Sequence, residues 1–429
     1  MELLTTIGFG ILFFALIMVS VALHEVGHML PAKRFGVRVP QYMVGFGPTL
    51  WSTTRGETEY GIKGFPLGGY VRLLGMYPPG SRREGKASRV AELADAARAQ
   101  EWSQITPQDV ADNRLFYQKK TWQKLVVMFG GPFMNILIAF ALFWGITALY
   151  GVNRAQTTIY HVSQCIVADS TQRDCEPGDP PTPAAEAGLR AGDTVIEFNG
   201  TAITSYEQLS GLIRANLDNE ARIVVERDGD RVELTPVNTV ITQVRDSWDP
   251  SRIVSAGFLG VSPEYVLTKG GPVEALSDMA TMAGQSLVAL AQLPVKVWNL
   301  VVDMVTGQPR DIYGPISILG ASQVAGQVIA QEDLSWQARA VTFASLLGSI
   351  NLFLAIFNLV PLPPLDGGHM LGAVWEWLRR QGARLLRRPD PGPVDTAKLL
   401  PVAYAVGGLL LLSGIVLILA DIINPLQLF

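Results

Sequence analysis

The chain has 429 residues, of which 48% are hydrophobic and only 17% are charged, and its mean hydropathy is +0.25. Soluble globular proteins average roughly 25% charged residues, so this composition is typical of a membrane protein and excludes collagen-like, coiled-coil and disordered chains. The formal net charge of −4 gives no electrostatic support for a nucleic-acid partner, and we expect none.

Four apolar segments are long enough to cross a membrane as helices. They lack Asp, Glu, Lys, Arg and His, and a spanning helix needs about 20 apolar residues. The four segments are residues 3–23, 125–153, 340–365 and 399–420. A fifth uncharged stretch, 279–295, is shorter and has its apolar residues at helical spacing. This pattern favours an amphipathic helix on the surface or against the bundle.

Basic residues predict the orientation in the membrane. Residues 33–124 contain 15 of the 34 Lys and Arg residues and residues 366–398 contain 6, whereas the longer stretch 154–339 contains 13. By the positive-inside rule the two denser loops are cytoplasmic. Both chain termini and the region from about 150 to 340 are then extracytoplasmic, and we expect a multi-pass protein of the plasma membrane.

The first apolar segment ends in His24-Glu25-Val26-Gly27-His28. On a helix, residues i and i+4 project from one face, so both imidazoles can bind one Zn²⁺ ion while Glu25 lies beside its open position. Such residues at the end of a span are costly unless they bind something. The alternative is a pair of satisfied polar residues at a helix end.

Residues 58–74 alternate around Gly-Phe-Pro-Leu-Gly-Gly, which predicts a short β-hairpin. Its apolar character beside a span suggests that it dips into the membrane. The following stretch, 85–114, is polar and alanine-rich, and we expect a mobile cytoplasmic insert there.

Short β-rich runs with turn signals occupy residues 159–262. Their Gly-Leu-x-x-Gly-Asp-x-Val sequence, residues 188–195, resembles the core of a PDZ domain of the bacterial protease-associated type. The resemblance implies an α+β fold that takes a peptide, or the stub of a substrate, as an added strand. The alternative is a rigid plug that binds no ligand.

Cys165 and Cys175 are the two cysteines of the chain. They lie in the segment that faces an oxidising compartment if the orientation is right, which favours a disulfide over two buried thiols.

A tetrahedral catalytic zinc ion needs a third protein ligand and a water molecule. His161 lies in the extracytoplasmic segment, across the bilayer from the motif. At the matching depth the third apolar segment runs into Asn-Leu-Val-Pro-Leu-Pro-Pro-Leu-Asp-Gly-Gly-His, residues 358–369. Asp366 and His369 both remain candidates for the third ligand.

His-Glu-x-x-His in a first span, followed later by Asn-x-x-Pro-x-Pro-x-Leu-Asp-Gly-Gly, resembles the site-2 protease family of intramembrane zinc metalloproteases, in particular the bacterial branch with a single PDZ domain. The resemblance implies that Asp366 is the third ligand of one Zn²⁺ per chain and that His369 is structural. It implies substrate binding by Asn358, which could instead satisfy carbonyls at a helix end. It implies the same role for Asn135, in Gly131-Pro-Phe-Met-Asn135, where close helix packing is the alternative.

The resemblance also implies the activity, a zinc metalloendopeptidase in which Glu25 is the general base. Expected substrates are single-span membrane proteins, such as anti-sigma factors already trimmed by a first protease or remnants of signal peptides, cleaved in regulated intramembrane proteolysis. A zinc or ion transporter would also place His and Asp near a broken helix, but the first span offers few polar residues for a path. A catalytically silent scaffold would tolerate the loss of Glu25, which is present.

The expected architecture is a polytopic α-helical membrane protein with four transmembrane helices, an extracytoplasmic α+β PDZ-like domain and a membrane-associated β-hairpin. The expected segments, in chain order, are a first span (1–32), a cytoplasmic segment with the hairpin (33–121), a second span (122–153), the PDZ-like domain (154–263), an amphipathic tether (264–339), a third span (340–365), a cytoplasmic loop (366–398) and a fourth span (399–424).

Overall fold

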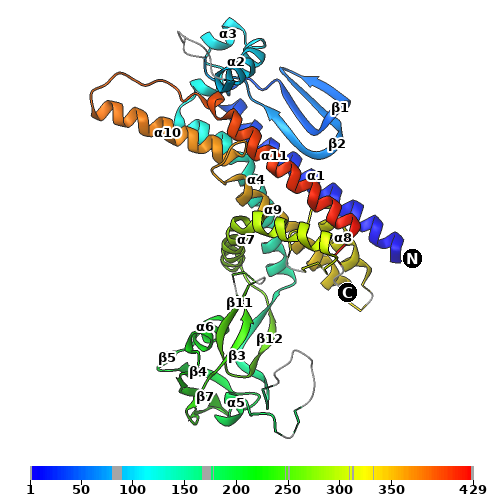
Figure 1. Cartoon of the computed structure of the whole chain (residues 1–429), viewed down its shortest axis with the longest axis vertical. Coiled ribbons are helices and arrows are strands. Elements are labelled where there is room, and N and C mark those ends of the chain that lie inside the picture. Colours follow the sequence, from blue (N-terminus) through cyan, green and yellow to red (C-terminus); the bar gives the residue numbers. More distant parts are fainter. Residues whose placement is uncertain are drawn as a thin grey trace. The chain divides into compact units, whose positions relative to one another are not determined.

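The computed structural model describes residues 2–79, 89–166, 175–176, 178–246, 248–249, 252–308, 310–311, 314–331 and 333–426. The chain divides into two compact units, Met1–Gly145 together with Ala275–Phe429, and Ile146–Glu274. Helices dominate the first unit and strands the second (Figure 1). A membrane protein with a separate β-rich part was the expectation, and at this level it is confirmed.

In the part of the chain that the structure describes, five helices are long and apolar enough to cross a membrane. They are α1 (Glu2–Arg34), α4 (Thr121–Leu149), α7 (Pro272–Thr306), α9 (Trp336–Asn358) and α11 (Leu400–Ile423). Four of them contain or closely match the predicted apolar segments. The fifth, α7, contains the stretch 279–295 and is 35 residues long, much longer than that stretch.

The third apolar segment ends as a helix earlier than its composition suggested. α9 stops at Asn358, and residues 359–365 form turns, because Pro361, Pro363 and Pro364 cannot continue a helix. The expected cytoplasmic loop 366–398 is also largely helical, since α10 spans Asp366–Leu385 and a short 3-10 helix, η2, spans Thr396–Leu399.

The predicted hairpin within residues 58–74 is wrong in its pairing. β1 (Gln41–Arg55) and β2 (Thr58–Arg72) form a two-stranded antiparallel sheet with several register shifts. Residues 41–44 of β1 pair with both 59–62 and 69–72 of β2, so they lie between the two runs that were expected to pair with each other. Pairing between segments distant in the chain is not encoded in the local alternation of either one.

The expected mobile insert, residues 85–114, is partly helical. α2 spans Arg89–Trp102 and α3 spans Pro107–Ala111, which begins with a capping box between Thr106 and Asp109. A 3-10 helix, η1 (Phe116–Gln118), leads into α4. The Arg98 guanidinium donates to both carboxylate oxygens of Asp395 at 2.9 Å, which joins α2 to the segment before α11. The described part of this insert is therefore anchored to the helical unit.

A short helix, α8 (Ile318–Ala330), packs closely against the first half of α1. A Cβ on Gly10 would lie 3.1 Å from the Ser322 carbonyl oxygen, and a Cβ on Gly326 would lie 2.2 Å from the Thr6 carbonyl oxygen. Phe13 and Ile17 are fully buried in the same contact, against Ala321 and Ala325. This contact fixes α1, the helix that carries both histidines of the motif.

The second unit is built on a twisted sheet with strand order β12-β3-β4-β7-β8. These strands are β3 (Val152–Val162), β4 (Thr194–Phe198), β7 (Ile223–Arg227), β8 (Asp230–Glu233) and β12 (Val261–Thr268). Smaller pairings join β4 to β5 (Thr201–Ala202), β6 (Glu220–Ala221) to β9 (Val237–Asn238), and β10 (Val240–Arg245) to β11 (Ile253–Phe258). α5 (Pro183–Glu186) and α6 (Tyr206–Asn216) complete the unit.

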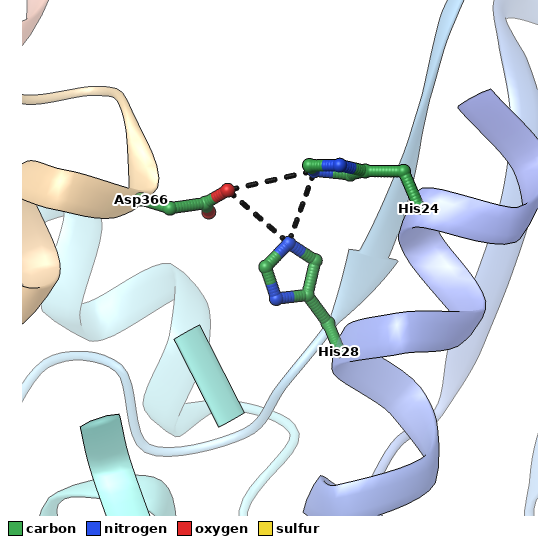
Figure 2. Close-up of side chains that lie close together, drawn as sticks. All are labelled: His24, His28 and Asp366. Atoms are coloured by element: carbon green, nitrogen blue, oxygen red, sulfur yellow. Dashed lines mark hydrogen bonds and ion pairs between the residues drawn. The ribbon is translucent and has the colours of Figure 1, made fainter. Parts of the chain in front are cut away.

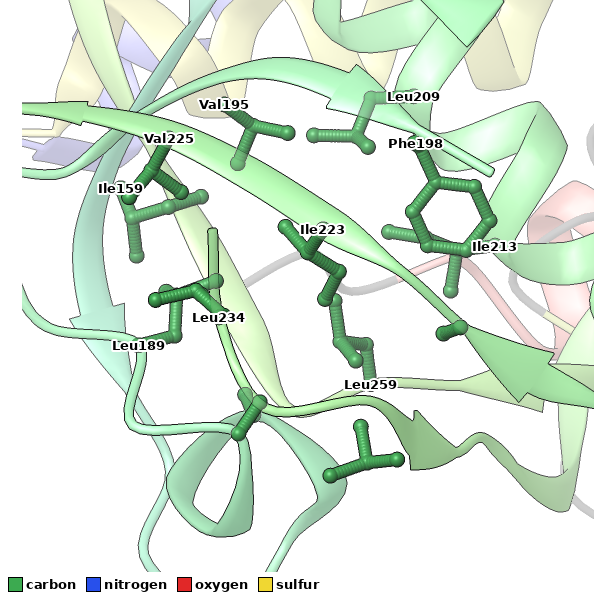
Figure 3. Close-up of a cluster of buried hydrophobic side chains, with 14 of the residues drawn as sticks. Ile159, Leu189, Val195, Phe198, Leu209, Ile213, Ile223, Val225, Leu234 and Leu259 are labelled. Atoms are coloured by element: carbon green, nitrogen blue, oxygen red, sulfur yellow. The ribbon is translucent and has the colours of Figure 1, made fainter. Parts of the chain in front are cut away.

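The core of this unit lies between the sheet and α6 (Figure 3). Phe198, Leu209 and Ile223 are at most 1% exposed. The two-residue turns Asn199-Gly200 and Asp228-Gly229 have positive φ at both residues, which is typical of tight hairpins with Asn-Gly or Asp-Gly turns. The short β-rich runs with turn signals that were expected in residues 159–262 correspond to these strands and turns.

Candidate active site

Three side chains from two distant parts of the sequence converge in the first unit (Figure 2). His24 and His28 lie one turn apart on α1, and Asp366 is the first residue of α10. The two Nε2 atoms are 3.2 Å apart, and the Oδ2 atom of Asp366 lies 3.5 Å from Nε2 of His24 and 3.3 Å from Nε2 of His28.

The three atoms have the spacing of ligands around one small ion. A tetrahedral zinc ion with bonds of about 2.0–2.1 Å separates its ligand atoms by about 3.3–3.4 Å. Space beside them is also kept free, because a Cβ on Gly131 would lie 2.2 Å from Nε2 of His28 and 2.7 Å from Nε2 of His24. Among the described residues this is the one cluster with metal-binding geometry. The donor set therefore fits Zn²⁺.

The backbone of α4 orients His28. Its Nδ1 atom lies 2.8 Å from the carbonyl oxygen of Val127, so Nδ1 donates and Nε2 keeps its lone pair for a metal. Nδ1 of His24 is buried and has no partner within the described part of the chain. The carbonyl of Val127 carries no signal in the sequence, and only the fold brings it to His28.

Two glycines let Asp366 reach the histidines. The chain folds back on itself between the end of α9 and the start of α10, so a Cβ on Gly367 would lie 2.3 Å from the carbonyl oxygens of Leu359 and Val360. A Cβ on Gly368 would lie 2.5 Å from the Pro363 nitrogen. Such contacts are possible only for glycine. The Gly-Gly pair after Asp366 is thus a requirement of the tight turn that aims its carboxylate.

Glu25 and both asparagines border the same cavity, whose volume is about 410 Å³. The amide nitrogen of Asn358 lies 3.5 Å from Nε2 of His24. Asn135 is 1% exposed, and its Oδ1 atom has no partner in the described structure. His369 also borders the cavity but is not part of the three-atom cluster. The structure thus brings together the candidates from the first, second and third spans.

One wall of the cavity is the second half of β2. Residues 68–71 border it, and 69–72 pair with 41–44 of β1 along one edge. No strand pairing occupies the other edge within the described residues. A Cβ on Gly69 would lie 3.2 Å from Cγ of Glu25, so this strand runs directly beside the glutamate. The hairpin was expected to dip into the membrane, and the second half of β2 lies beside Glu25.

The second unit contains the other candidates. Cys165 and Cys175 are joined by a disulfide, with their Cα atoms 5.9 Å apart. His161 lies on β3 of that unit and is not part of the cluster of ligand atoms.

Known proteins similar to this chain are metalloproteases. The family model of peptidase family M50 matches residues 12–385. The zinc metalloprotease Rip1 of Mycobacterium tuberculosis H37Rv is 37% identical over 440 residues, which cover 98% of both chains. The metalloprotease MmpA of Caulobacter vibrioides and the zinc metalloprotease RasP of Oceanobacillus iheyensis are each 27% identical and cover 88% and 86% of this chain and 89% of their own lengths.

Proposed function

Because this chain belongs to peptidase family M50, the family of the site-2 proteases, and is a zinc metalloprotease, we propose that its substrates are single-span membrane proteins cleaved within or near the bilayer. Anti-sigma factors trimmed by a first protease and remnants of signal peptides are the substrate types that fit. One observation carries the proposal: the ligand cluster, Glu25 and an unpaired strand edge share one cavity at the end of a membrane helix.

In this mechanism His24, His28 and Asp366 hold the zinc ion. When bound, zinc supplies Lewis acidity, which acidifies water and stabilises negative charge on the carbonyl oxygen. Glu25 accepts the proton of the attacking water and later delivers a proton to the leaving amine. Asn135 and Asn358 bind the substrate backbone, since both amides border the cavity and the Oδ1 atom of Asn135, which has no partner among the described residues, can accept a hydrogen bond.

The strand edge at residues 69–72 addresses a difficulty peculiar to membrane substrates. A transmembrane helix shields its peptide bonds in its own hydrogen-bond ladder, and it must unwind before hydrolysis. Pairing of the unwound segment with the edge of β2 that no described strand occupies replaces the lost hydrogen bonds and holds the peptide beside Glu25. The short separation of Gly69 and Glu25 supports this arrangement.

The experiment is cleavage of candidate single-span proteins by the purified enzyme in liposomes, with and without zinc. Glu25→Gln should abolish cleavage and keep about one zinc per chain, because the amide cannot accept the proton while the ligands remain. Residual turnover above a few per cent of the unmodified enzyme would contradict the role of Glu25, and zinc-independent cleavage would contradict the mechanism.

We further propose that four helices cross the membrane and that α7 does not. α7 begins on the side where α4 ends, because only the β-rich unit separates them. It ends near Arg310, which forms a buried ion pair of 2.6 Å with Asp421 at the end of α11. The first half of α11 borders a cavity together with His369, on the side of the proposed metal ligands. The far end of α11 therefore lies on the opposite side of the membrane. α4 also ends on that opposite side. Both ends of α7 are then on one side.

We propose that the side with both ends of α7 faces the outside of the cell, because the basic loops lie on the opposite side of the membrane. The disulfide in the second unit supports it, since disulfides persist in oxidising compartments. Single cysteines at Ser103 and Asp228, both exposed, test it, because the native cysteines are bonded and do not react. The Asp228→Cys variant should be labelled from outside and Ser103→Cys only after the inner face is exposed; the reverse would contradict the orientation.

For the second unit we propose a PDZ-like peptide site along β12. This strand is an edge of the sheet and, among the described strands, pairs with β3 alone. An exposed edge can take an extended peptide as a further strand, and the stub left by a first protease would supply one. The test is binding of stub peptides to the full-length enzyme by fluorescence polarisation. No binding at millimolar peptide would mean that the unit acts as a plug.

A further inference from the structure

The helix that begins with Asp366 has two faces of different character. One face of α10 packs on the protein through Ala373 and Glu376, which are 6% and 3% exposed. Both oxygens of Glu376 lie 3.0 Å from the Lys124 ammonium, and one of them accepts a hydrogen bond from the Val394 amide. The first three turns of α10 are thereby fixed to the start of α4 and to the segment before α11.

The opposite face of α10 is apolar and exposed. Its members recur at intervals of three, four and seven residues, so they form one stripe along the helix. They are Leu371 (53% exposed), Val374 (37%), Trp375 (55%), Leu378 (48%) and Leu385 (84%). α10 is nonetheless not among the helices long and apolar enough to span a membrane. Figure 1 shows its C-terminal end (orange) extending away from the other helices of the first unit.

The distal part of α10 is strongly basic. Residues 377–388 contain five arginines and no acidic residue. Arg384, Arg387 and Arg388 are exposed, and they cluster where the apolar stripe ends. An amphipathic helix with an apolar face containing tryptophan and with arginines beside it is suited to the interface of an anionic bilayer. The helix also lies between α9 and α11, so its surroundings include the membrane surface in which those two helices end.

We propose that α10 lies in the cytoplasmic leaflet with its apolar stripe among the lipid chains and Arg384, Arg387 and Arg388 on the headgroups of anionic phospholipids. The inference rests on the proposed orientation. It has a functional consequence, because Asp366 is the first residue of α10. Anionic lipid that seats the distal part of the helix adds to the contacts of Glu376 in holding Asp366 against His24 and His28, so the leaflet composition changes the fraction of enzyme with an assembled site.

The experiment compares full-length enzyme in liposomes of phosphatidylcholine alone and in liposomes with 30% phosphatidylglycerol. A Leu378→Cys variant carries an environment-sensitive fluorophore, and the bonded native cysteines remain unlabelled. Each arginine near an anionic surface strengthens partitioning roughly fivefold. We expect a blue-shifted emission and several-fold higher cleavage with phosphatidylglycerol. The triple variant Arg384→Gln/Arg387→Gln/Arg388→Gln should lose both effects, because its partitioning weakens roughly a hundredfold.

A matched control removes three arginines from the second unit, Arg222→Gln/Arg231→Gln/Arg252→Gln, all exposed in that unit. It should retain both effects. Zinc content and cleavage in neutral detergent show that each variant is folded. Water-like emission in both lipids overturns the proposal, as does a blue shift that depends on enzyme concentration, which would indicate a second chain on the stripe. A lipid-dependent shift with unchanged cleavage overturns the link to Asp366. If no substrate is cleaved under any condition, the proposed function fails, while the emission still decides the lipid contact.

Discussion

A Cβ atom on Gly130 would lie 2.0 Å from the carbonyl oxygen of Gly27, and a Cβ on Gly27 would lie 2.2 Å from the carbonyl oxygen of Gly130. α1 and α4 therefore touch backbone to backbone at Gly27, between His24 and His28. Small residues permit such close crossings in membranes. The contact brings the Val127 carbonyl to His28 and sets Gly131 beside both Nε2 atoms. One helix crossing thus both orients His28, a proposed ligand, and leaves space for the metal that it would bind.

The first prediction concerns Gly131. Gly131→Ala should lower zinc affinity, because the added Cβ would occupy the space beside both imidazoles. We expect a loss of about 10–100-fold, the range found when the surroundings of metal ligands are disturbed. Zinc content after dialysis against a graded chelator measures this. Gly145→Ala on the same helix is the control, since its Cβ would have no atom within 4 Å. Equal zinc retention by the two variants would show that α4 does not shape the metal space.

The second prediction separates two neighbouring candidates. Asp366→Ala should lose zinc, because its carboxylate lies within 3.5 Å of both imidazole nitrogens. His369→Ala should keep about one zinc per chain, because its imidazole is outside the cluster. Metal analysis of both purified variants decides between them, and retention of stoichiometric zinc by Asp366→Ala would exclude it as the third ligand.

The sequence predicted those parts of the site that depend on short spacing. His24, Glu25 and His28 share one helix, so their relation follows from the helical repeat alone. Asp366 and His369 are three residues apart and could not be separated by spacing, and only family resemblance favoured Asp366. The pairing of β1 with β2 was missed because it joins segments whose local alternation is the same in either arrangement.

α10 was missed for a different reason. A search for uncharged stretches passes over residues 366–398, since six basic residues interrupt them. The spacing of Leu371, Trp375 and Leu378 is a helical signal that a periodicity search would find. The packing of Glu376 on Lys124 has no such signal, because it joins residues far apart in the chain.

The third prediction concerns acid stability of the second unit. Burial raises the pKa of Asp193, but hydrogen bonds from the Arg227 guanidinium and the Arg190 amide outweigh it, so the pKa of this carboxyl is below its usual value. A carboxyl whose pKa is lower in the folded state stabilises the fold at pH values above its unfolded pKa of about 3.9. This stabilisation is lost as the pH falls further.

Protection of the β4 and β7 amides from hydrogen exchange, corrected for intrinsic rates, should therefore fall as the pH drops below about 4. Asp193→Asn should be less protected by about 1–3 kcal/mol at pH 7 and should lose this dependence. Glu220→Gln is the control, because its ion pair with Arg222 is exposed and contributes little. An unchanged acid profile in Asp193→Asn would assign the loss to other carboxylates.

The fourth prediction concerns Glu101 at the end of α2, which is 8% exposed. One of its oxygens accepts from the amides of Gly75 and Met76 at 2.8 Å, and the other accepts from the amide of Tyr77 at 3.0 Å. These residues begin three positions after the end of β2 at Arg72, and Met76 borders the active-site cavity. The carboxylate thus fixes the turn at the end of the strand that we propose to bind the unwound substrate.

Glu101→Gln keeps one acceptor oxygen but turns an NH₂ group toward a backbone N–H. We expect kcat/KM to fall about 5–30-fold, equivalent to about 1–2 kcal/mol, while zinc content stays at one per chain. Since the turn positions a binding strand and supplies no reacting group, KM should change more than kcat. Glu92→Gln removes the same charge from an exposed site on the same helix and should match the unmodified enzyme. If Glu101→Gln instead lowers kcat and zinc content together with KM unchanged, the residue supports the metal centre as a whole and not the strand.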